Sequence, residues 1–354
     1  MDIATKATTR TANTPPATAT RSPGSGPQST GSRDFRSQAA ASQTSGPADT
    51  MRDRFVDVTT RILDRDPRTA LVLADISVDR FRQCGALERH PERIVNVGIR
   101  EQAMIGVAAG LALEGFRVLA HSFAPFLVER PFEQVKLDLG HQGVAAILVG
   151  VGASDDIAAM GRTHQAPADV ALLATLPGWQ IHVPGHPDEV ETILDVAARG
   201  DGNVYVRLSD QANRAPMVSA AGRVEVVRRA GAGAPIALAV GPMLDPLLDA
   251  TSDLDLTVLY TATVQPLDGE ALRAVAGAAD AILVEPTLQG TSLPAFAEAL
   301  GDRARRLLAI GEPAEELRRY GSAAEHRRAH GLDAAGLHRR IATFLDAGVG
   351  GARA

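Results

Sequence analysis

The stretch that decides the fold runs from Arg93 to Gly115 and has the sequence RIVNVGIREQAMIGVAAGLALEG. Its first five residues are typical of a short buried strand, and Gly98 follows them where a tight turn is expected. The residues after the turn are almost all small or apolar and predict a helix. Glu101 lies at the start of that helix. A carboxylate beside an apolar wall, on the end of a rigid element, is suited to proton chemistry.

Apolar runs of strand length alternate with helical stretches along most of the chain. Strands are expected at 70–75, 93–97, 117–122, 144–150, 179–184, 203–208, 235–240, 256–260, 281–285 and 306–310. Helices are expected at 51–65, 101–113, 126–139, 166–175, 187–198, 243–250, 268–278, 292–300 and 334–346. Short apolar strands with helical crossovers indicate parallel sheets covered on both faces. The predicted fold class is therefore α/β, with two three-layer domains and mainly parallel sheets.

Composition divides the chain into four predicted segments. Residues 1–48 are rich in Ser, Thr, Pro and Ala and have few apolar side chains. Such a tail cannot bury enough surface to offset its ordering entropy, so it is expected to be disordered. A first α/β domain is predicted at 50–212, a linker at 213–234 and a second, smaller α/β domain at 235–350.

Charge and cysteine content exclude several classes of protein. The 354 residues carry a net charge of -6, which gives no electrostatic basis for binding nucleic acid. The sequence has no apolar run long enough for a membrane span. Cys84 is the single cysteine, so an internal disulfide is impossible and a reducing, cytoplasmic location is expected.

Three clusters of residues follow one another in the order found in a known family. They are Gly98-Ile-Arg-Glu-Gln102, the aromatic run from Ser122 to Val135, and Gly161-Arg-Thr-His-Gln165. These clusters resemble the pyrimidine-binding domain of transketolases, in particular the separate C-terminal subunit of split bacterial transketolases. The second domain resembles the C-terminal domain of that family, with Gln265-Pro-Leu-Asp268 and Val284-Glu285 in the expected places. The resemblance covers about residues 51 to 347.

The resemblance implies thiamine diphosphate as the cofactor and gives Glu101 its role. The carboxyl group would share a proton with N1′ of the aminopyrimidine and favour its imino form, which takes the proton from the thiazolium C2. The resulting carbanion attacks a ketone. Partial desolvation of Glu101 would keep the shared proton in this hydrogen bond. The alternative is an ordinary first-turn glutamate that interacts with the helix dipole.

The other cofactor residues are also implied by the resemblance. Phe123 and Phe126 would hold the pyrimidine ring by stacking, Phe132 would support them, and Ile99 would contact the cofactor. Core packing is the alternative for the phenylalanines. His164 would face the thiazolium end and the reacting carbonyl, where it donates a hydrogen bond or moves a proton; a loop histidine in water is the alternative.

The chain offers only half of a cofactor site. Gly200-Asp-Gly-Asn203 resembles the start of the motif that binds Mg²⁺ and diphosphate, but a strand follows it at once, so a turn is the better interpretation. The resemblance therefore implies an N-terminal transketolase-type partner subunit that supplies the Mg²⁺ ligands, in a two-plus-two heterotetramer. No metal is assigned to this chain, because His121, His141, His182 and His186 show no metal-ligand spacing and a cap or packing role is expected for each.

The substrate positions depart from those of phosphosugar transketolases. Met160 stands where the family has an aspartate, Gly152 where it has a histidine, and Asp210 where it has an arginine in a Ser-Arg-Gln run. A negative charge at a phosphate seat repels phosphate. The substrate site is expected to involve Met160, Arg162 and His164, and either Arg162 or Arg207 is a candidate to replace the lost positive charge.

The predicted function is that of the C-terminal subunit of a thiamine diphosphate-dependent enzyme that transfers a two-carbon ketol or acyl unit. Its substrates would be a small ketose or acyl donor and an acceptor, on a specialised route of secondary metabolism. One alternative is the β subunit of a 2-oxo acid dehydrogenase, although the Thr163-His164-Gln165 run favours transketolase. A second alternative is a non-catalytic assembly subunit, whose signature would be loss of the acid or the aromatic pocket.

Overall fold

The computed structural model describes residues 50–217, 222–277 and 279–351, and the predicted tail at 1–48 lies outside these residues. The described part opens with helix α2 (Met51–Arg65), which has the predicted bounds. Its start is fixed by Thr50, whose side-chain oxygen accepts a hydrogen bond of 3.0 Å from the amide of Asp53. None of the helices in the described residues combines the length and hydrophobicity that a bilayer span needs.

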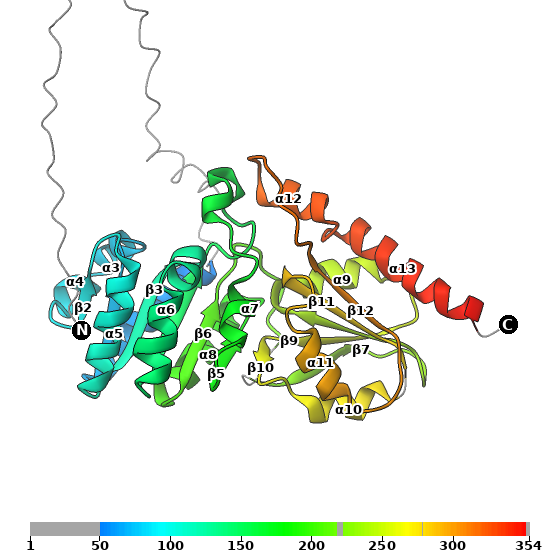
Figure 1. Cartoon of the computed structure of the whole chain (residues 1–354), viewed down its shortest axis with the longest axis horizontal. Helices are drawn as coiled ribbons and strands as arrows, with labels where there is room; N and C mark the ends of the chain where they lie inside the picture. Colours follow the sequence, from blue (N-terminus) through cyan, green and yellow to red (C-terminus); the bar gives the residue numbers. More distant parts are fainter. Residues whose placement is uncertain (1–49, 218–221, 278, 352–354) are drawn as a thin grey trace, which may run out of the picture. The chain divides into compact units, whose positions relative to one another are not determined.

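The first sheet has seven strands in the order β10-β5-β6-β4-β3-β1-β2 (Figure 1). Six of them pair in parallel: β1 (Thr69–Leu73), β2 (Ile94–Asn96), β3 (Arg117–Phe123), β4 (Ala146–Val151), β5 (Trp179–His182) and β6 (Asn203–Arg207). Strand β10 (Thr263–Gln265) pairs antiparallel with β5. Because β10 comes from much later in the chain, the first sheet is completed by the second half of the sequence.

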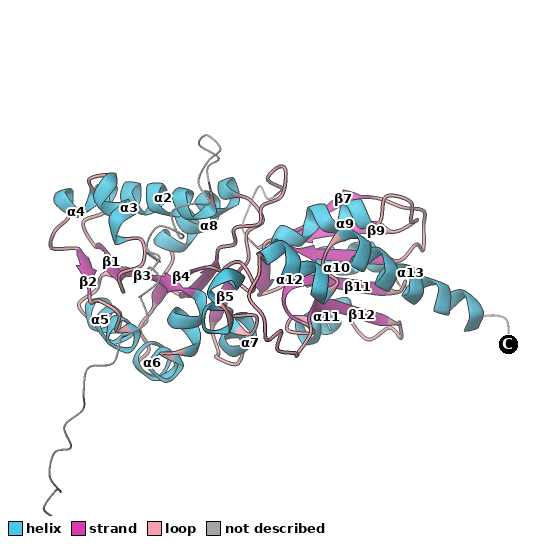
Figure 2. Ribbon diagram, turned by 90° about the horizontal axis from the view of Figure 1, so that it is seen from above, coloured by secondary structure: helices cyan, strands magenta, loops and turns pink. Residues whose placement is uncertain are grey.

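Helices cover both faces of this sheet (Figure 2). One face carries α2, α3 (Val78–Gln83), α4 (Ala86–Arg89) and α8 (Pro187–Arg199). The other face carries α5 (Glu101–Leu113), α6 (Phe132–Gln134) and α7 (Asp169–Ala174). Successive strand residues point to opposite faces, so Leu71 and Leu73 pack in the first core and Val72 packs in the second.

The second sheet has five strands in the order β12-β11-β8-β9-β7. Its parallel strands are β8 (Ile236–Val240), β9 (Thr257–Thr261), β11 (Ala281–Leu288) and β12 (Leu307–Glu312), and β7 (Val224–Arg228) is antiparallel to β9. Helices α9 (Leu244–Ala250) and α13 (Ala334–Gly351) pack on one face, and α10 (Gly269–Ala276) and α11 (Leu293–Leu300) on the other. The predicted α/β class with mainly parallel sheets is confirmed.

Five α-helices and strands were not predicted: the short helices α3 and α4, and the three elements β7, β10 and α12. Strand β7 lies inside the stretch 213–234 that was expected to be a linker; its residues are only half-buried, so the run lacks the strong apolar signal of a central strand. Strand β10 is three residues long, too short to give a pattern. Helix α12 (Ala323–His330) is polar, and its start is set by a capping box between Ser322 and Glu325.

The helix expected at 126–139 is divided into three pieces. Two stretches have π-helical hydrogen bonding, η1 (Pro125–Glu129) and η2 (Val135–His141), and the short α6 lies between them. Pro131 stands at the division because it has no amide hydrogen to donate to a continuous helix. Single π-helical turns are often found at functional sites. The first of these two stretches, η1, carries Phe126.

A network of hydrogen bonds around a buried ion pair joins the first sheet to the second. The guanidinium of Arg207 in β6 lies 2.9 Å from Asp169 at the start of α7, and the two side chains are 1% and 0% exposed. Arg207 also donates to the hydroxyl of Ser154 at 2.5 Å, and Tyr205 donates to Asp169 at 2.6 Å. Ser154 in turn donates to the backbone carbonyl of Pro286 in β11. The network therefore fixes the loop after β4 to both sheets.

Arg207→Met is expected to lower the free energy of unfolding by about 3–5 kcal/mol, because it leaves the Asp169 carboxylate buried without its partner. Urea denaturation measures this loss. Arg199→Met is the matched control: Arg199 is 66% exposed and its ion pair with Asp195 contributes at most about 1 kcal/mol. Equal effects of the two substitutions would contradict the structural role of Arg207.

Candidate active site

Glu101 lies at the carboxyl ends of the parallel strands, in the first turn of α5. The turn that places it depends on Gly98, whose φ of 71° favours glycine. The Asn96 side-chain oxygen stabilises this turn by accepting hydrogen bonds from the amides of Gly98, at 3.2 Å, and Asp75, at 3.0 Å. Glu101 is only 1% exposed, so its carboxylate is withdrawn from water on a rigid element.

Arg130 is the charged partner of this carboxylate. Its Nη1 atom donates to Oε2 of Glu101 at 2.7 Å, and its guanidinium carbon lies 4.1 Å from the centre of the Phe126 ring. Because the Arg130 side chain is 38% exposed, it reaches the buried acid from the solvent side. This contact was not predicted, although Arg130 lies within the aromatic run that was singled out in the sequence.

The structure brings together residues from all three sequence clusters. The rings of Phe123 and Phe126 are 6.1 Å apart and nearly perpendicular. The imidazole of His164 lies 5.0 Å from the Phe126 ring and 5.9 Å from the Phe123 ring. Glu101 joins them through Arg130 and Phe126. These contacts support the predicted grouping of an acid, two aromatic rings and a histidine at one place.

His164 is half-buried in a short 3₁₀ turn, η4 (Arg162–His164). Its Nδ1 atom lies 3.0 Å from the hydroxyl of Thr163. Burial, together with the nearby positive charge of Arg130, lowers the pKa of His164. The imidazole is therefore neutral at neutral pH, and Nε2 is the nitrogen that has no hydrogen-bond partner among the described residues.

Other predicted site residues lie in different surroundings. Phe132 is half-buried against the core under α5, which matches the packing alternative. Ile99 is 71% exposed and Met160 is 46% exposed. Arg162 is exposed, and it donates to the backbone carbonyl of Gln165 at 3.1 Å. A cofactor role for Ile99 and Phe132 and a substrate role for Met160 and Arg162 stay predictions.

The position of the missing family histidine is filled by a neighbour. At Gly152, a Cβ atom would lie 2.2 Å from Cδ1 of Ile157 and 3.2 Å from the Phe123 ring, and φ is 68°. Any side chain at this position would therefore require Ile157 to move and the backbone to accept strain. If Gly152 occupies the place that the resemblance gives to a family histidine, the packing of Ile157 excludes that histidine here.

A group of charges lies close to Phe123. Arg52 lies 5.8 Å from the Phe123 ring centre and donates to the hydroxyl of Ser77 at 3.0 Å. The amide of Asp210 donates to the Asp156 carboxylate at 2.9 Å. Burial and the neighbouring Asp210 carboxylate raise the pKa of Asp156 to about 7. This end of the site therefore holds both signs of charge.

The surroundings of Arg207 do not favour the suggested role toward phosphate. Its side chain is 1% exposed and is held in the ion pair with Asp169. Gly200 to Asn203 forms the predicted turn between α8 and β6.

The four histidines considered in the sequence have the following positions. His186 caps α8, as expected, by accepting from the amide of Asp188. His121 and His182 are buried, and burial lowers their pKa values to about 3 and about 4. His121 bonds to Ser77, and His182 bonds to Thr263 of β10. His141 is exposed. These environments agree with packing and capping roles for the first three.

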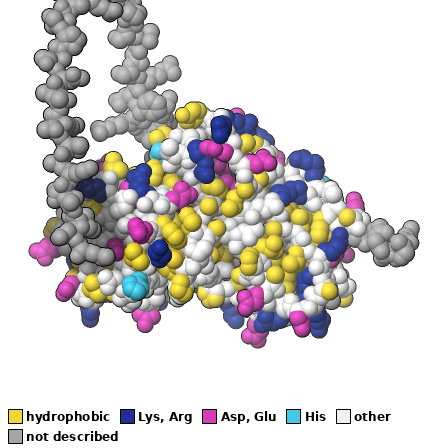
Figure 3. Space-filling model, in the orientation of Figure 1, with side chains coloured by type: hydrophobic (Ala, Val, Ile, Leu, Met, Phe, Trp, Pro, Cys, Tyr) yellow, Lys and Arg dark blue, Asp and Glu magenta, His cyan; other side chains and the backbone are white. Residues whose placement is uncertain are grey.

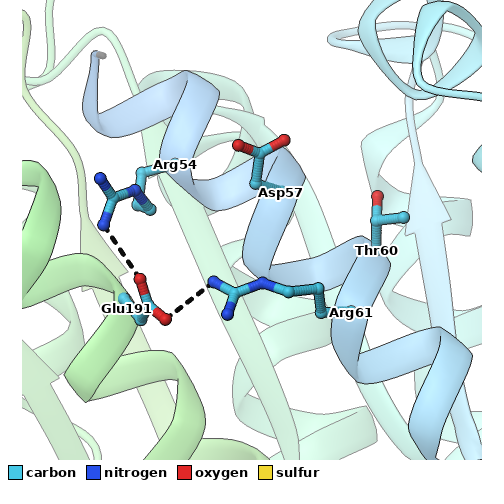
Figure 4. Close-up of a pocket in the computed structure, with 5 residues that line it drawn as sticks. All are labelled: Arg54, Asp57, Thr60, Arg61 and Glu191. Carbon is cyan, nitrogen blue, oxygen red and sulfur yellow. Dashed lines mark hydrogen bonds and ion pairs between the residues drawn. The ribbon is translucent and has the colours of Figure 1, made fainter.

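A separate hollow between α2 and α8 has none of these features (Figure 4). It has a volume of about 470 Å³ and is lined by Arg54, Asp57, Thr60, Arg61 and Glu191. The Glu191 carboxylate lies 2.9 Å from Arg54 and 2.8 Å from Arg61. Three of its charged side chains, Arg54, Arg61 and Glu191, thus form ion pairs with one another, and neither an aromatic ring nor a histidine lines it.

Comparison with known proteins agrees with this fold. Residues 48–216 match the family described as transketolase, pyrimidine binding domain. The chain is 44% identical over 287 residues to an uncharacterized 33.6 kDa protein in the fasciation locus of Rhodococcoides fascians, covering 80% of this chain and 91% of that protein. It is 31% identical over 234 residues to one of the subunits of apulose-4-phosphate transketolase from Actinobacillus succinogenes, covering 64% of this chain and 73% of that relative.

A solved structure described as a split gene transketolase, an inactive β4 tetramer, has the same fold. Its TM-score is 0.70 at 23% sequence identity, covering 83% of this chain and 97% of that chain. The fold and the sequence matches together define an α/β protein of the pyrimidine-binding class. The chain belongs to the transketolase family, as a C-terminal subunit of the split type.

Asp156→Asn is expected to reduce the fall in stability that accompanies rising pH. The pKa of Asp156 is raised from 3.8 to about 7 in the folded chain, so the folded state holds this proton more tightly than the unfolded state. The stabilising contribution is complete below about pH 4 and is lost as pH rises through about 7. Between about pH 5.5 and about pH 8, the melting temperature should fall less for the variant than for the wild type. An equal fall would contradict the assignment, and exposed Asp57→Asn serves as the control.

Proposed function

We propose that this chain is the pyrimidine-binding subunit of a heteromeric, thiamine diphosphate-dependent enzyme that transfers a two-carbon ketol or acyl unit. The observation that supports this most strongly is the buried Glu101 carboxylate, which Arg130 links to the Phe126 ring, itself grouped with Phe123 and a neutral His164. When bound, thiamine diphosphate would supply a nucleophilic carbon that makes and breaks the bond next to a ketone carbonyl. Cytoplasmic location accords with the single free cysteine, Cys84.

The residues present fit the aminopyrimidine end of this cofactor. Phe126 and Phe123 offer aromatic faces for stacking, and Glu101 offers a desolvated carboxyl that exchanges a proton with a ring nitrogen. Arg130 now lies on the Phe126 ring and bonds to Glu101, so the same space would serve the pyrimidine. We infer that Arg130 swings away toward solvent when the site is filled, since its side chain is partly exposed.

His164 would act on the substrate side. Its Nδ1 atom is hydrogen-bonded to the Thr163 hydroxyl, which leaves Nε2 to meet a carbonyl or hydroxyl oxygen. Because its pKa is lowered, the neutral ring can accept a proton and later return it at neutral pH. In this proposal Glu101 exchanges a proton with the cofactor, and His164 exchanges a proton with the substrate.

The substrate would be a specialised one. Gly152 and Ile157 leave no room for the histidine of the phosphosugar enzymes, and Asp210 places a carboxylate where they have an arginine. A phosphate group would be repelled by Asp210, whereas sugar hydroxyls could bond to it. Arg52, next to Phe123, would bind a hydroxyl or carbonyl oxygen of the donor. A place in secondary metabolism is part of this proposal.

The outer face of α5 has the properties of a docking surface for a partner subunit. Gln102, Ala103, Gly106, Gly110 and Leu113 are all exposed, and Ile99 adjoins them just before the helix. Small residues on one helix face allow another backbone to approach closely. On the face drawn in Figure 3, hydrophobic side chains are exposed between charged groups of both signs. We propose that the N-terminal-type subunit, carrying the diphosphate and Mg²⁺ ligands, docks on α5 in a two-plus-two assembly, and that this chain is inactive without it.

Glu101→Gln is expected to lower the ketol-transfer rate of the assembled enzyme by about 10²–10⁴-fold, because the amide cannot exchange the proton. The rate is measured with the partner subunit, thiamine diphosphate and Mg²⁺ in excess. Exposed Glu88→Gln is the matched control and should retain full activity. Full activity of the Glu101 variant, or release of CO₂ from a 2-oxo acid as the main reaction, would contradict the proposal.

Gly110→Arg is expected to weaken assembly with the partner subunit about tenfold or more while leaving the chain folded. A side chain at Gly110 meets open space, and replacing a helical glycine raises helix stability by up to about 1 kcal/mol. Analytical ultracentrifugation measures assembly and thermal melting measures folding. Val196→Arg is the control, because Val196 is an exposed residue of α8. Unchanged assembly, or a loss confined to self-association of this chain, would contradict docking of the partner on α5.

A further inference from the structure

A second cluster of chemical groups lies where α12 meets the loop that follows β4. Asp155 belongs to that loop, and His326 and His330 belong to α12. One ligand-type atom from each residue lies within 4.8 Å of the others. Nδ1 of His326 is 3.4 Å from one Asp155 carboxylate oxygen, and Nε2 of His330 is 3.9 Å from the other.

The sequence of α12 explains why the two imidazoles meet. His326 and His330 are four residues apart, so they lie on the same face of the helix, one turn from each other. The capping box at Ser322 fixes the start of the helix, and Gly331 ends it in the left-handed conformation. The two rings are therefore presented to Asp155 by a helix with defined ends, with ring centres 6.3 Å apart.

The three side chains are buried, yet their polar atoms are unsatisfied. The exposed fraction is 6% for Asp155, 0% for His326 and 5% for His330. Within the described residues, all four imidazole nitrogens and Oδ2 of Asp155 lack a hydrogen-bond partner. The distances of 3.4 and 3.9 Å are too long for good hydrogen bonds. Burying unpaired polar groups is costly, so such a group of atoms calls for an explanation.

A divalent transition-metal ion would satisfy these atoms. Zinc binds histidine nitrogen and carboxylate oxygen at about 2.0–2.2 Å in tetrahedral geometry, which separates neighbouring ligand atoms by about 3.3–3.6 Å. The His326–Asp155 distance of 3.4 Å already falls in this range, whereas His330 lies 3.9 Å from the other carboxylate oxygen. Because the three ligand atoms lie within 4.8 Å of one another, side-chain movements of about 1 Å would bring them to these separations. Imidazole and carboxylate ligands also suit Zn²⁺ better than Mg²⁺ or Ca²⁺.

We propose that Asp155, His326 and His330 form a binding site for Zn²⁺ or a similar divalent transition-metal ion. The fourth position faces a cavity of about 320 Å³, which Asp155 and His330 line together with Glu312 and Arg162. Either the Glu312 carboxylate or a water molecule would complete the coordination. The ion is a structural one: it joins α12 to the loop between Asp155 and Gln165, which carries His164.

This site was not predicted from the sequence, although one signal was present. The spacing His326-Arg-Arg-Ala-His330 places two ligands on one helical turn, as in many zinc sites. The third ligand, Asp155, comes from the other α/β unit of the sequence. Only the folded chain brings Asp155 to the two histidines. No metal was predicted for this chain from its sequence, which does not relate Asp155 to these histidines.

The test begins with the full-length wild-type chain, stripped of metal with EDTA and then dialysed. Titration with Zn²⁺ against a chromophoric chelator should give one equivalent bound with a Kd of about 1 μM or tighter. Saturation with Zn²⁺ should raise the melting temperature by about 5 °C. Elemental analysis of the dialysed, zinc-loaded protein should give one zinc per chain. Less than about 0.1 equivalent bound, with an unchanged melting temperature, would overturn the proposal.

Variants then assign the ion to these residues. His326→Gln, His330→Gln and Asp155→Asn should each weaken Zn²⁺ binding by about 100-fold or more and abolish the thermal shift, since even loss of an outer-sphere contact costs 10–100-fold. Exposed His141→Gln is the matched control and should bind like the wild type. Because the wild-type titration does not depend on any variant, misfolding of one variant leaves the test intact. Undiminished binding in the His326→Gln/His330→Gln double variant would overturn the assignment.

Discussion

Withdrawal of the Glu101 carboxylate from water is the constraint on which the site depends. The side chain is 1% exposed, and three features accompany its burial: the amino end of α5, the guanidinium of Arg130 and the Phe126 ring on which Arg130 lies. Helix α5 follows β2, whereas Arg130 and Phe126 belong to the segment after β3, so the features meet where the carboxyl ends of two parallel strands lie. A change that moved α5 away from this edge would expose the acid to water and remove the desolvation that its proposed proton exchange needs.

The loop that carries His164 is held by a second set of buried charges. Arg207 and Asp169 fix the start of this region through Ser154, which also bonds to Pro286 of the second sheet. The Asp155 cluster with α12 lies next to it. The loop therefore connects the two sheets, and the position of His164 relative to Phe126 depends on residues far from the site. This arrangement explains why so much charge is buried around a short segment.

The sequence predicted most of the fold because its strongest patterns are local. Helices α2 and α5 have the expected bounds, since Thr50 caps one and the Gly98 turn precedes the other. Strand β7 was missed because it is a half-buried edge strand without a strong apolar pattern. Strand β10 was missed because three residues are too few to show a pattern. In the site, the order of three sequence motifs was enough to predict Glu101, Phe123, Phe126 and His164. Arg130 and the ligand Asp155 could not be found in this way, because their partners are set by tertiary contact.

The most direct test of the central claim is the rate at which the C2 proton of thiamine diphosphate exchanges for deuterium in the assembled enzyme. NMR of the acid-quenched cofactor measures this step without requiring knowledge of the substrate. Replacing Glu101 by glutamine is expected to slow the exchange by about 10²-fold or more while the cofactor stays bound. Exchange at the wild-type rate in the variant would show that Glu101 does not activate the cofactor.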